Sequence, residues 1–394
     1  MFELEEVTTV EEESGATVIK VVGVGGAGGN AVEHMIREGV GGVEFICCNT
    51  DAQALLKSAA HVKLQLGPGL GAGGKPEKAR ELAQAERGRI AEALAGAHMV
   101  FITAGMGGGT GTGAGPVIAE VARELGILTV AVVTKPFEYE GKRKRLAEEG
   151  VAELAQHVDS LIVILNEKLE EVLGDDVSML DAFKAADNVL RNAVGGIAEI
   201  INVPGLVNVD FEDVRTVMGE MGKAMMGSAA AAGVDRARIA AEEAVASPLL
   251  EGVELSGARG VLVNITASTS LGLKEYKEVM NTIRQYTAAE ATVICGAVFD
   301  ETMEDRLRVT VVATGLGGVI AKARKPEMKV VETIGLRTGT DNLHVFDMTV
   351  GQVDLTSVVS SGRGSSPRNA QADAMAASGV DKYDIPAFLR RQSD

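Results

Sequence analysis

The sequence predicts an α/β protein of two domains, the first of them built on a mainly parallel sheet. Short β-branched runs alternate with helical stretches from residue 17 onward, and glycine-rich segments follow several of these runs. Strands that alternate with helices form a parallel sheet covered on both faces. A long helical stripe then leads into a second, smaller α/β layer domain. The 394 residues are enough for two full cores and a tail.

The elements of the first half follow from the spacing of apolar residues. The predicted strands are 16–25, 43–51, 98–106, 126–137 and 158–169, and the predicted helices are 29–40, 51–60 and 115–126. Ligands bind such sheets at the carboxyl ends of the strands. The glycine-rich segments lie at these ends, so we expect the ligand site there.

A long helix is expected at 178–205, where Ser178 to Asp181 fits a capping box and Pro204-Gly205 ends the pattern. Apolar residues recur in it at helical spacing, at Leu180, Phe183, Ala186, Leu190, Ala193, Val194, Ile197 and Ile201. In the second domain we expect strands at 257–268, 291–299 and 307–316 and helices at 211–226, 236–247 and 273–287. The chain therefore divides into an acidic extension (1–16), a ligand-binding domain (17–177), a connecting helix (178–205), a second domain (206–316), a flexible linker (317–379) and a C-terminal peptide (380–394).

Composition excludes several classes of protein. A net charge of −17 argues against non-specific binding to nucleic acid, and 3% aromatic residues leave few rings for base stacking. No apolar run approaches the roughly 18 residues of a membrane span, and the acidic N-terminus does not fit a signal or transit peptide. The cysteines Cys47, Cys48 and Cys295 lack metal-ligand spacing, so we expect reduced, buried thiols in a cytosolic protein.

The first glycine-rich segment, GVGGAGGNAV from Gly23, matches the pattern Gly-x-Gly-x-x-Gly between a predicted strand and a predicted helix. Such a turn brings backbone close to phosphate at a helix N-terminus. With Asp51 as the acidic residue further along, a dinucleotide site for an oxidoreductase is one interpretation, and a tight turn without ligand is another. The segment from Gly69 to Lys75 resembles a P-loop, but Pro76 replaces the required Ser or Thr, so we reject a Walker-type site.

The segment GMGGGTGTG, residues 105–113, distinguishes these hypotheses. Successive backbone N–H groups form an anion-binding concavity, Thr110 and Thr112 add hydroxyl groups, and Pro116 suits the first turn of a following helix. A dinucleotide fold needs one glycine-rich phosphate turn, whereas this sheet carries two at neighbouring strand ends. Two turns favour a nucleoside triphosphate held along its phosphate chain.

These motifs carry a resemblance to a known family. GGGTGTG resembles the signature loop of tubulin-like proteins, and GVGGAGGNAV, NTDAQAL, ILTVAVVTKPF, NVDFEDVRTVM, GARGVLVNIT and RVTVVATGL occur in order with it. The chain resembles the FtsZ family of bacterial tubulin-like cell-division GTPases over about residues 17–316 and again at the tail YDIPAFLRRQSD. The resemblance implies a tubulin-like fold with a GTP-binding domain, a connecting helix and a C-terminal activation and polymerisation domain.

The resemblance also implies site residues. Those implied to bind GTP or GDP are Gly25, Gly26, Ala27, Gly28, Gly29, Asn30, Asn49, Asp51, Gly107, Gly108, Gly109, Thr110, Gly111, Thr112, Gly113, Thr134, Glu140, Arg143, Asn166, Phe183 and Asp187. Among them, Phe183 would stack on guanine, and Asn166 and Asp187 would pair with its edge. From the residues alone, Asp187 would be a solvated helix position.

Three further residues, Asn208, Asp210 and Asp213, are implied to complete the site of the next subunit. Mg²⁺ would neutralise charge on the γ-phosphate, and no protein ligand for it is assigned. Taken locally, Asp210 and Asp213 equally fit an N-cap and a favourable first-turn acid.

Three features depart from the family pattern. Arg143, Lys144 and Arg145 compete for one nucleotide contact, Leu165 stands where a proline is usual, and Pro68 lies in a shortened loop at 67–74. In the tail, Ile385, Phe388 and Leu389 share a helical face. The implied partner-binding residues are Asp384, Ile385, Pro386, Phe388, Leu389 and Arg390, and the implied partners are membrane tethers and assembly regulators of division.

The leading hypothesis is a GTPase that polymerises head to tail into the filaments of the division ring and hydrolyses GTP to GDP between successive subunits. Its expected location is the cytoplasm at mid-cell, during septation. A nicotinamide or flavin oxidoreductase and a nucleotide-binding scaffold without hydrolysis are the alternatives.

Overall fold

Ten strands form one sheet that runs through both halves of the described chain. The computed structural model describes residues 17–174, 178–203, 207, 209–220, 222–247 and 257–316. The strand order is β3-β2-β1-β4-β5-β6-β7-β10-β8-β9. The first six strands are parallel, β7 joins β6 in parallel, and β10 is antiparallel to both β7 and β8. The predicted mainly parallel sheet is confirmed.

The elements of the first half are β1 (Ile19–Val24), α1 (Gly25–Arg37), β2 (Val43–Asn49), α2 (Ala52–Lys57), β3 (Val62–Gln65), α3 (Pro76–Ala85), α4 (Arg87–Leu94), β4 (Met99–Gly105), α5 (Thr110–Glu124), β5 (Leu128–Lys135), η1 (Glu138–Glu140), α6 (Lys142–Leu154), β6 (Ser160–Leu165) and α7 (Asn166–Leu173). Those of the second are α8 (Met179–Asn202), α9 (Phe211–Met218), β7 (Gly222–Ala232), α10 (Arg236–Val245), β8 (Gly260–Ala267), α11 (Leu273–Tyr286), β9 (Thr292–Phe299), η4 (Glu301–Met303) and β10 (Arg306–Leu316).

Alternation along the strands creates a core on each face of the first-half sheet. Val21 of β1 joins a cluster with residues of α1, α8 and α9, whereas Val22 joins a cluster with residues of α3, α4, α5 and α6. The neighbouring cysteines divide in the same way, Cys47 to the first cluster and Cys48 to the second. All three cysteines are free and buried, as predicted, and burial raises the pKa of each thiol.

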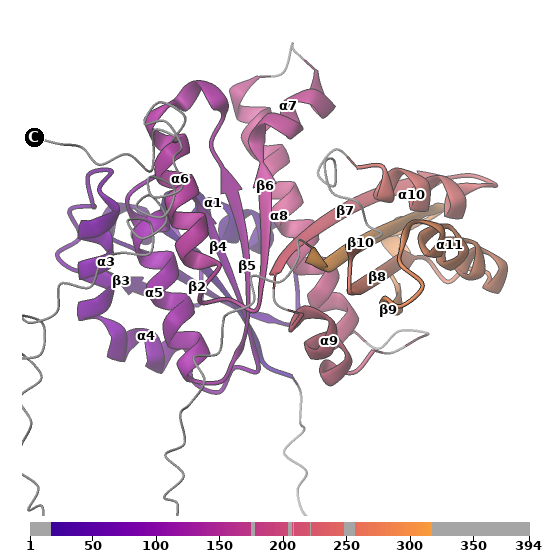
Figure 1. The fold of residues 1–394 in the computed structure, drawn as a ribbon, viewed down its shortest axis with the longest axis horizontal. Helices are drawn as coiled ribbons and strands as arrows, with labels where there is room; N and C mark the ends of the chain where they lie inside the picture. Colours follow the sequence, from indigo (N-terminus) through magenta and orange to yellow (C-terminus); the bar gives the residue numbers. More distant parts are fainter. Residues whose placement is uncertain are drawn as a thin grey trace, which may run out of the picture. The chain divides into compact units, whose positions relative to one another are not determined.

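The helix α8 connects the two halves. Ser178 is its N-cap and accepts a hydrogen bond from the Asp181 N–H, as the predicted capping box requires. In Figure 1 α8 runs beside β6, with β7 to β10, α10 and α11 beyond it. It contacts β5 of the first half and β8, β9 and β10 of the second. Pro204 and Gly205, which were predicted to end it, lie outside the described residues.

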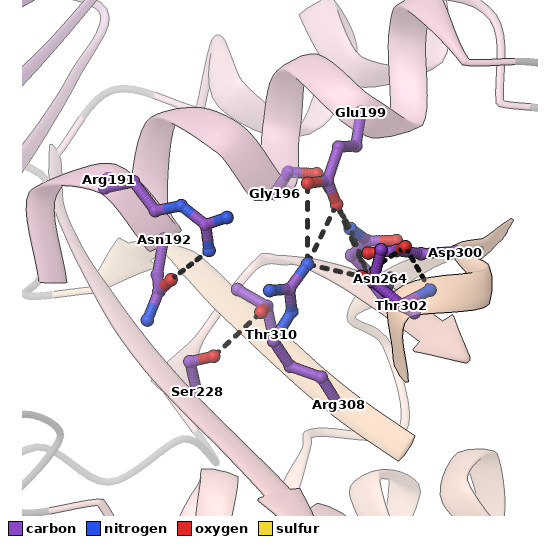
Figure 2. A network of polar contacts seen from close by, with 11 residues as sticks. Arg191, Asn192, Gly196, Glu199, Ser228, Asn264, Asp300, Thr302, Arg308 and Thr310 are labelled. Atoms are coloured by element: carbon purple, nitrogen blue, oxygen red, sulfur yellow. Dashed lines mark hydrogen bonds and ion pairs between the residues drawn. The ribbon is translucent and has the colours of Figure 1, made fainter. Parts of the chain in front are cut away.

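A polar network ties α8 to the second half (Figure 2). Arg308 of β10 lies 3.2 Å from the Glu199 carboxylate of α8, and the amide of Asn264 in β8 donates to the Gly196 carbonyl at 3.1 Å. Asn264 is buried. Because such hydrogen bonds are directional, they fix how α8 is seated on the second part of the sheet.

The helices predicted at 29–40 and 115–126 begin earlier, at Gly25 and Thr110, so Pro116 lies inside α5 and not in its first turn. Two other predicted elements are wrong. The predicted helix 211–226 is α9 followed by β7, because Gly219 caps α9 at its C-terminus and Gly222 begins a strand that pairs with β6 and β10. The predicted strand 158–169 ends at Leu165, and α7 begins at Asn166. The elements β3, α3, α4 and α6 were not predicted. Among the described residues, no helix is long and apolar enough to span a bilayer.

Candidate functional site

The first glycine turn joins β1 directly to α1. A Cβ at Gly23 would lie 2.4 Å from the Gly28 carbonyl oxygen, and one at Gly28 would lie 2.3 Å from the Thr103 carbonyl oxygen. These two glycines therefore permit close packing of α1 on the strands. In contrast, a Cβ at Gly26 or Gly29 would meet nothing within 4 Å, so the backbone there borders open space. Of the adjacent residues, Ala27 and Asn30 are exposed at the same helix N-terminus.

The second glycine loop joins β4 to α5 and meets the first. A Cβ at Gly25, whose φ is +76°, would lie 3.0 Å from the Gly111 backbone nitrogen. The N-termini of α1 and α5 thus come together, and each helix N-terminus presents unpaired N–H groups and a positive dipole end. Such a meeting point suits an anion with several charged oxygens.

Packing accounts for much of the glycine in this loop. A Cβ at Gly113 would lie 2.0 Å from the Pro76 carbonyl oxygen, one at Gly111 2.6 Å from the Gly105 carbonyl oxygen, and one at Gly107 2.5 Å from the Arg143 carbonyl oxygen. Gly109 packs against Ala72, and only Gly108, of the glycines at 107–113, would carry a Cβ without neighbours. The loop therefore combines tightly packed positions with a half-buried backbone at Gly108, where a Cβ would meet open space.

The two loop threonines have different surroundings. Thr112 is buried, and its Oγ1 accepts a hydrogen bond of 2.9 Å from the Gly107 N–H, which holds the loop in shape. Thr110 is half-buried, and its Oγ1 lies 2.7 Å from the Oγ1 of Thr50. Thr50 was not predicted as a site residue, although it stands between the predicted Asn49 and Asp51.

Asn49 and Asp51 form the third wall of the site, at the end of β2. Asn49 Oδ1 accepts from the Asp51 N–H, and Asp51 Oδ1 caps α2 by accepting from the Gln53 N–H at 2.9 Å. A cavity of about 310 Å³ opens between α1 and α2. Six predicted residues line it, namely Gly25, Gly26, Gly29, Asn30, Asn49 and Asp51.

The segment after β5 contributes a carboxylate and a guanidinium. Glu140 accepts a hydrogen bond from the Phe137 N–H at 3.2 Å and a second from Arg143 Nη1. Lys144 pairs instead with Glu138, and Arg145 with Glu149. Since the Arg143 backbone also packs against Gly107, Arg143 is the best placed of the three competing cations. Thr134 is the penultimate residue of β5, beside this segment, and its carbonyl accepts from the Met106 N–H.

Asn166, Phe183 and Asp187 come from two helices in contact, α7 and α8. Asn166 is 7% exposed, and its Oδ1 is buried without a hydrogen-bond partner in the described structure. Phe183 is 47% exposed and meets Phe137 edge to face at 6.3 Å between ring centroids. Phe137 was not predicted as a site residue. The sequence feature that could have pointed to it is an aromatic residue at the end of a predicted strand, three residues before Glu140.

Asp187 is half-buried between α8 and α1. Burial raises the pKa of its carboxyl to about 6, and the nearby His34 and Arg37 of α1 oppose that rise. Asp187 is therefore half-buried, not fully solvated as the residues alone suggested. At neutral pH its carboxylate is an acceptor in a partly desolvated setting, where hydrogen bonds to a charged group are strong.

Asp210 and Asp213 lie far from these residues along α8. Asp210 caps α9, and its Oδ1 accepts from the Asp213 N–H at 2.8 Å, so the local interpretation of Asp210 is confirmed. Both aspartates are exposed. From Phe183 to its last residue, Asn202, α8 spans roughly 30 Å, and both aspartates follow that end of the helix. Asn208 and the predicted tail residues lie outside the described residues.

The site can also be tested for a metal ion. In the described part of the chain, no group of three His, Cys, Asp or Glu side chains is placed to hold a metal ion. Mg²⁺ commonly binds through substrate phosphates and water with one or two carboxylates. The exposed carboxylates of Asp210 and Asp213 therefore fit a Mg²⁺ ion that arrives bound to a nucleotide better than an ion held permanently by the protein.

Comparison with known proteins identifies the family. Residues 18–174 match the profile of the Tubulin/FtsZ family GTPase domain, and residues 222–317 match that of the FtsZ family C-terminal domain. The cell division protein FtsZ of Pseudomonas aeruginosa is 54% identical over 404 residues, an alignment that covers 100% of both chains. The chain belongs to the FtsZ family. It is a tubulin-like GTPase of that family, so the alternative interpretation as an oxidoreductase is wrong.

Other FtsZ proteins and tubulin-like structures agree. The FtsZ of Coxiella burnetii is 52% identical over 396 residues, covering 99% of each chain. The empty FtsZ dimer of M. jannaschii is 44% identical, with a TM-score of 0.73 over 76% of this chain and 88% of that one. CetZ2 of Haloferax volcanii, solved as a GTPγS-bound protofilament, is 21% identical, with a TM-score of 0.66 over 76% of this chain and 94% of that one, and shows the fold alone.

Proposed function

We propose that this FtsZ-family chain binds GTP at the meeting point of α1 and α5 and polymerises head to tail. GTP hydrolysis to GDP then takes place between successive subunits. The observation that carries the proposal is the separation of two groups of residues along the chain. The glycine turns, Asn166, Phe183 and Asp187 lie at one end of α8, and Asp210 and Asp213 lie past its other end.

The first group suits the nucleotide. Backbone N–H groups at two helix N-termini would hold the phosphates, with Arg143 and Glu140 toward the sugar and phosphates. The exposed ring of Phe183 would stack on the base. The Asp187 carboxylate would accept the two N–H donors on the guanine edge, and the unpartnered Asn166 Oδ1 would gain a donor. Adenine offers a different edge, which explains a preference for GTP.

The second group suits catalysis in trans. Roughly 30 Å is too far for Asp210 or Asp213 to reach a γ-phosphate in the same subunit. In a head-to-tail contact they would meet the γ-phosphate of the next subunit, together with Asn208, and orient the attacking water. Mg²⁺ bound by the phosphates would neutralise charge that develops during transfer. GTP would strengthen the interface, and its hydrolysis would weaken it.

At the cellular scale we propose that the filaments form the division ring at mid-cell in the cytoplasm. The tail residues Asp384, Ile385, Pro386, Phe388, Leu389 and Arg390 would bind membrane tethers and assembly regulators. The family membership supports this assignment.

The direct test is turnover per subunit as a function of protein concentration, with Mg²⁺ and either GTP or ATP. A site shared by two subunits predicts a threshold concentration above which GTP turnover per subunit rises, with light scattering rising alongside. Turnover that is constant per subunit over a 20-fold range, or equal with ATP, would contradict the proposal. Assembly with GTP but without turnover would favour the non-hydrolysing scaffold.

A further inference from the structure

One side-chain hydrogen bond ties together the two helices that flank the candidate nucleotide site. His34 Nε2 of α1 donates to Asn188 Oδ1 of α8 across 2.7 Å. The N-terminus of α1 carries the first glycine turn, and α8 carries Phe183 and Asp187. This bond, made on the exposed side of the packed pair α1 and α8, therefore joins the helix at the phosphate end of the site to the helix at the base end.

Helical spacing relates this bond to the predicted ligand contacts. Asn30 and His34 are four residues apart on α1 and share a face, as Phe183 and Asp187 do on α8. Asn188 is adjacent to Asp187, so a bond held at Asn188 limits rotation of this part of α8 about its own axis.

The apolar contacts of α8 do not supply the same restraint. Its buried stripe at this level consists of Ala186 and Leu190. Apolar packing is non-directional, whereas a hydrogen bond requires alignment of its donor and acceptor. His34 and Arg37 of α1 both lower the pKa of the partly buried Asp187 carboxyl, against the larger effect of burial.

We propose that His34 is a positioning residue for guanine recognition. By holding Asn188, it fixes the direction in which Asp187 presents its carboxylate to the base edge. His34 would act without touching the nucleotide. The inference rests on the proposed function, because it assumes that Asp187 recognises guanine.

The test measures nucleotide affinity below the concentration at which filaments form. GTP is compared with inosine triphosphate, which lacks the exocyclic amine of guanine and so makes one bond fewer to Asp187. His34→Ala should lower GTP affinity about five-fold, the equivalent of one hydrogen bond, and affect inosine triphosphate less. The ratio of the two affinities therefore falls toward one.

Two further variants separate positioning from general damage. His34→Gln should restore the ratio, because its side-chain amide can donate to Asn188 Oδ1. Asn188→Ala should reproduce the effect of His34→Ala, and the double variant should lose nothing more, since both remove the same bond. His157→Ala, just beyond α6, is the control and should leave both affinities unchanged.

The outcomes are distinguishable. Three outcomes would overturn the positioning role of His34 while leaving the guanine site intact. They are an equal loss of affinity for both nucleotides, additive effects of His34→Ala and Asn188→Ala, and failure of His34→Gln to restore the affinity ratio. A wild-type protein that does not distinguish GTP from ATP overturns the proposed function, and the role of His34 with it.

Discussion

At the scale of single residues, the site keeps polar groups in surroundings that cost stability. Burial raises the pKa of the Asp187 carboxyl to about 6, and the Asn166 Oδ1 is buried without a partner in the described structure. Most buried polar groups in proteins are hydrogen-bonded. Residues that break this rule at a strand end are expected where a ligand supplies the missing partner.

Asp187→Asn should therefore stabilise the protein and weaken GTP binding. The pKa of the Asp187 carboxyl in the folded protein lies above its ordinary value. The free energy of unfolding is therefore higher at low pH, where this carboxyl is protonated, and falls as pH rises through about 6. Removing the charge should raise the melting temperature of the nucleotide-free protein at pH 7.5 but not near pH 4. GTP affinity should fall about 10- to 100-fold. A lower melting temperature at pH 7.5, or unchanged GTP affinity, would contradict this role of Asp187.

Gly113 should be intolerant of a methyl group for reasons of packing alone. Its Cβ would lie 2.0 Å from the Pro76 carbonyl oxygen, a backbone atom at the start of α3. Gly113→Ala should lower the free energy of unfolding by about 1–3 kcal/mol, as overpacking does. Gly115→Ala, two residues along α5 where a Cβ meets nothing within 4 Å, is the matched control and should be neutral or slightly stabilising. Urea denaturation compares the two, and equal stabilities would exclude the packing role.

At the scale of elements, α9 combines a structural cap with an exposed acid. Asp210 Oδ1 accepts from the Asp213 N–H, whereas the Asp213 side chain is in the first turn and exposed. Structural and catalytic roles can therefore be separated by substituting one aspartate at a time.

Asp210→Ala should lower the free energy of unfolding by about 1 kcal/mol through loss of the cap. Asp213→Asn keeps the N–H that Asp210 caps and loses only a first-turn charge, so its free energy of unfolding should fall by less, about 0.3–1 kcal/mol. If both aspartates act on the neighbouring nucleotide, both variants should lose most GTP turnover. Denaturation midpoints and turnover above the assembly threshold provide the two measurements. Full GTP turnover in Asp213→Asn would exclude a catalytic role for Asp213 and leave it only the role of a favourable charge at the N-terminus of α9.

Elements whose local chemistry agrees with their environment were predictable from the sequence. Ser178 caps α8, and the glycine-rich segments lie at the predicted junctions of β1 with α1 and of β4 with α5. The strand β7 was not predictable, because GKAMMGSAAAA contains no β-branched residue and becomes a strand only through pairing with β6 and β10. The hydrogen bond between His34 and Asn188 could not be predicted either, because 154 residues separate the two along the chain.

At the scale of the whole molecule, α8 keeps the two functional ends apart. The polar network at Glu199 and Arg308 fixes this helix on the second part of the sheet (Figure 2), and α1 and α7 contact it near the residues proposed to bind the base (Figure 1). The β6–β7 pairing continues the sheet between the halves. One subunit therefore presents a nucleotide pocket and a pair of acids as separate surfaces, and the central claim is that hydrolysis requires one of each from different subunits.

Mixing two inactive variants tests that claim most directly. Asp213→Asn keeps the nucleotide pocket and lacks an acid, whereas Asp187→Ala keeps the acids and lacks a guanine contact. Each alone should show little GTP turnover. In a 1:1 mixture, the pocket of the first variant and the acids of the second form complete sites, so we expect turnover well above the sum of the two. Turnover no greater than that sum, with mixed assembly verified by co-sedimentation, would contradict hydrolysis in trans.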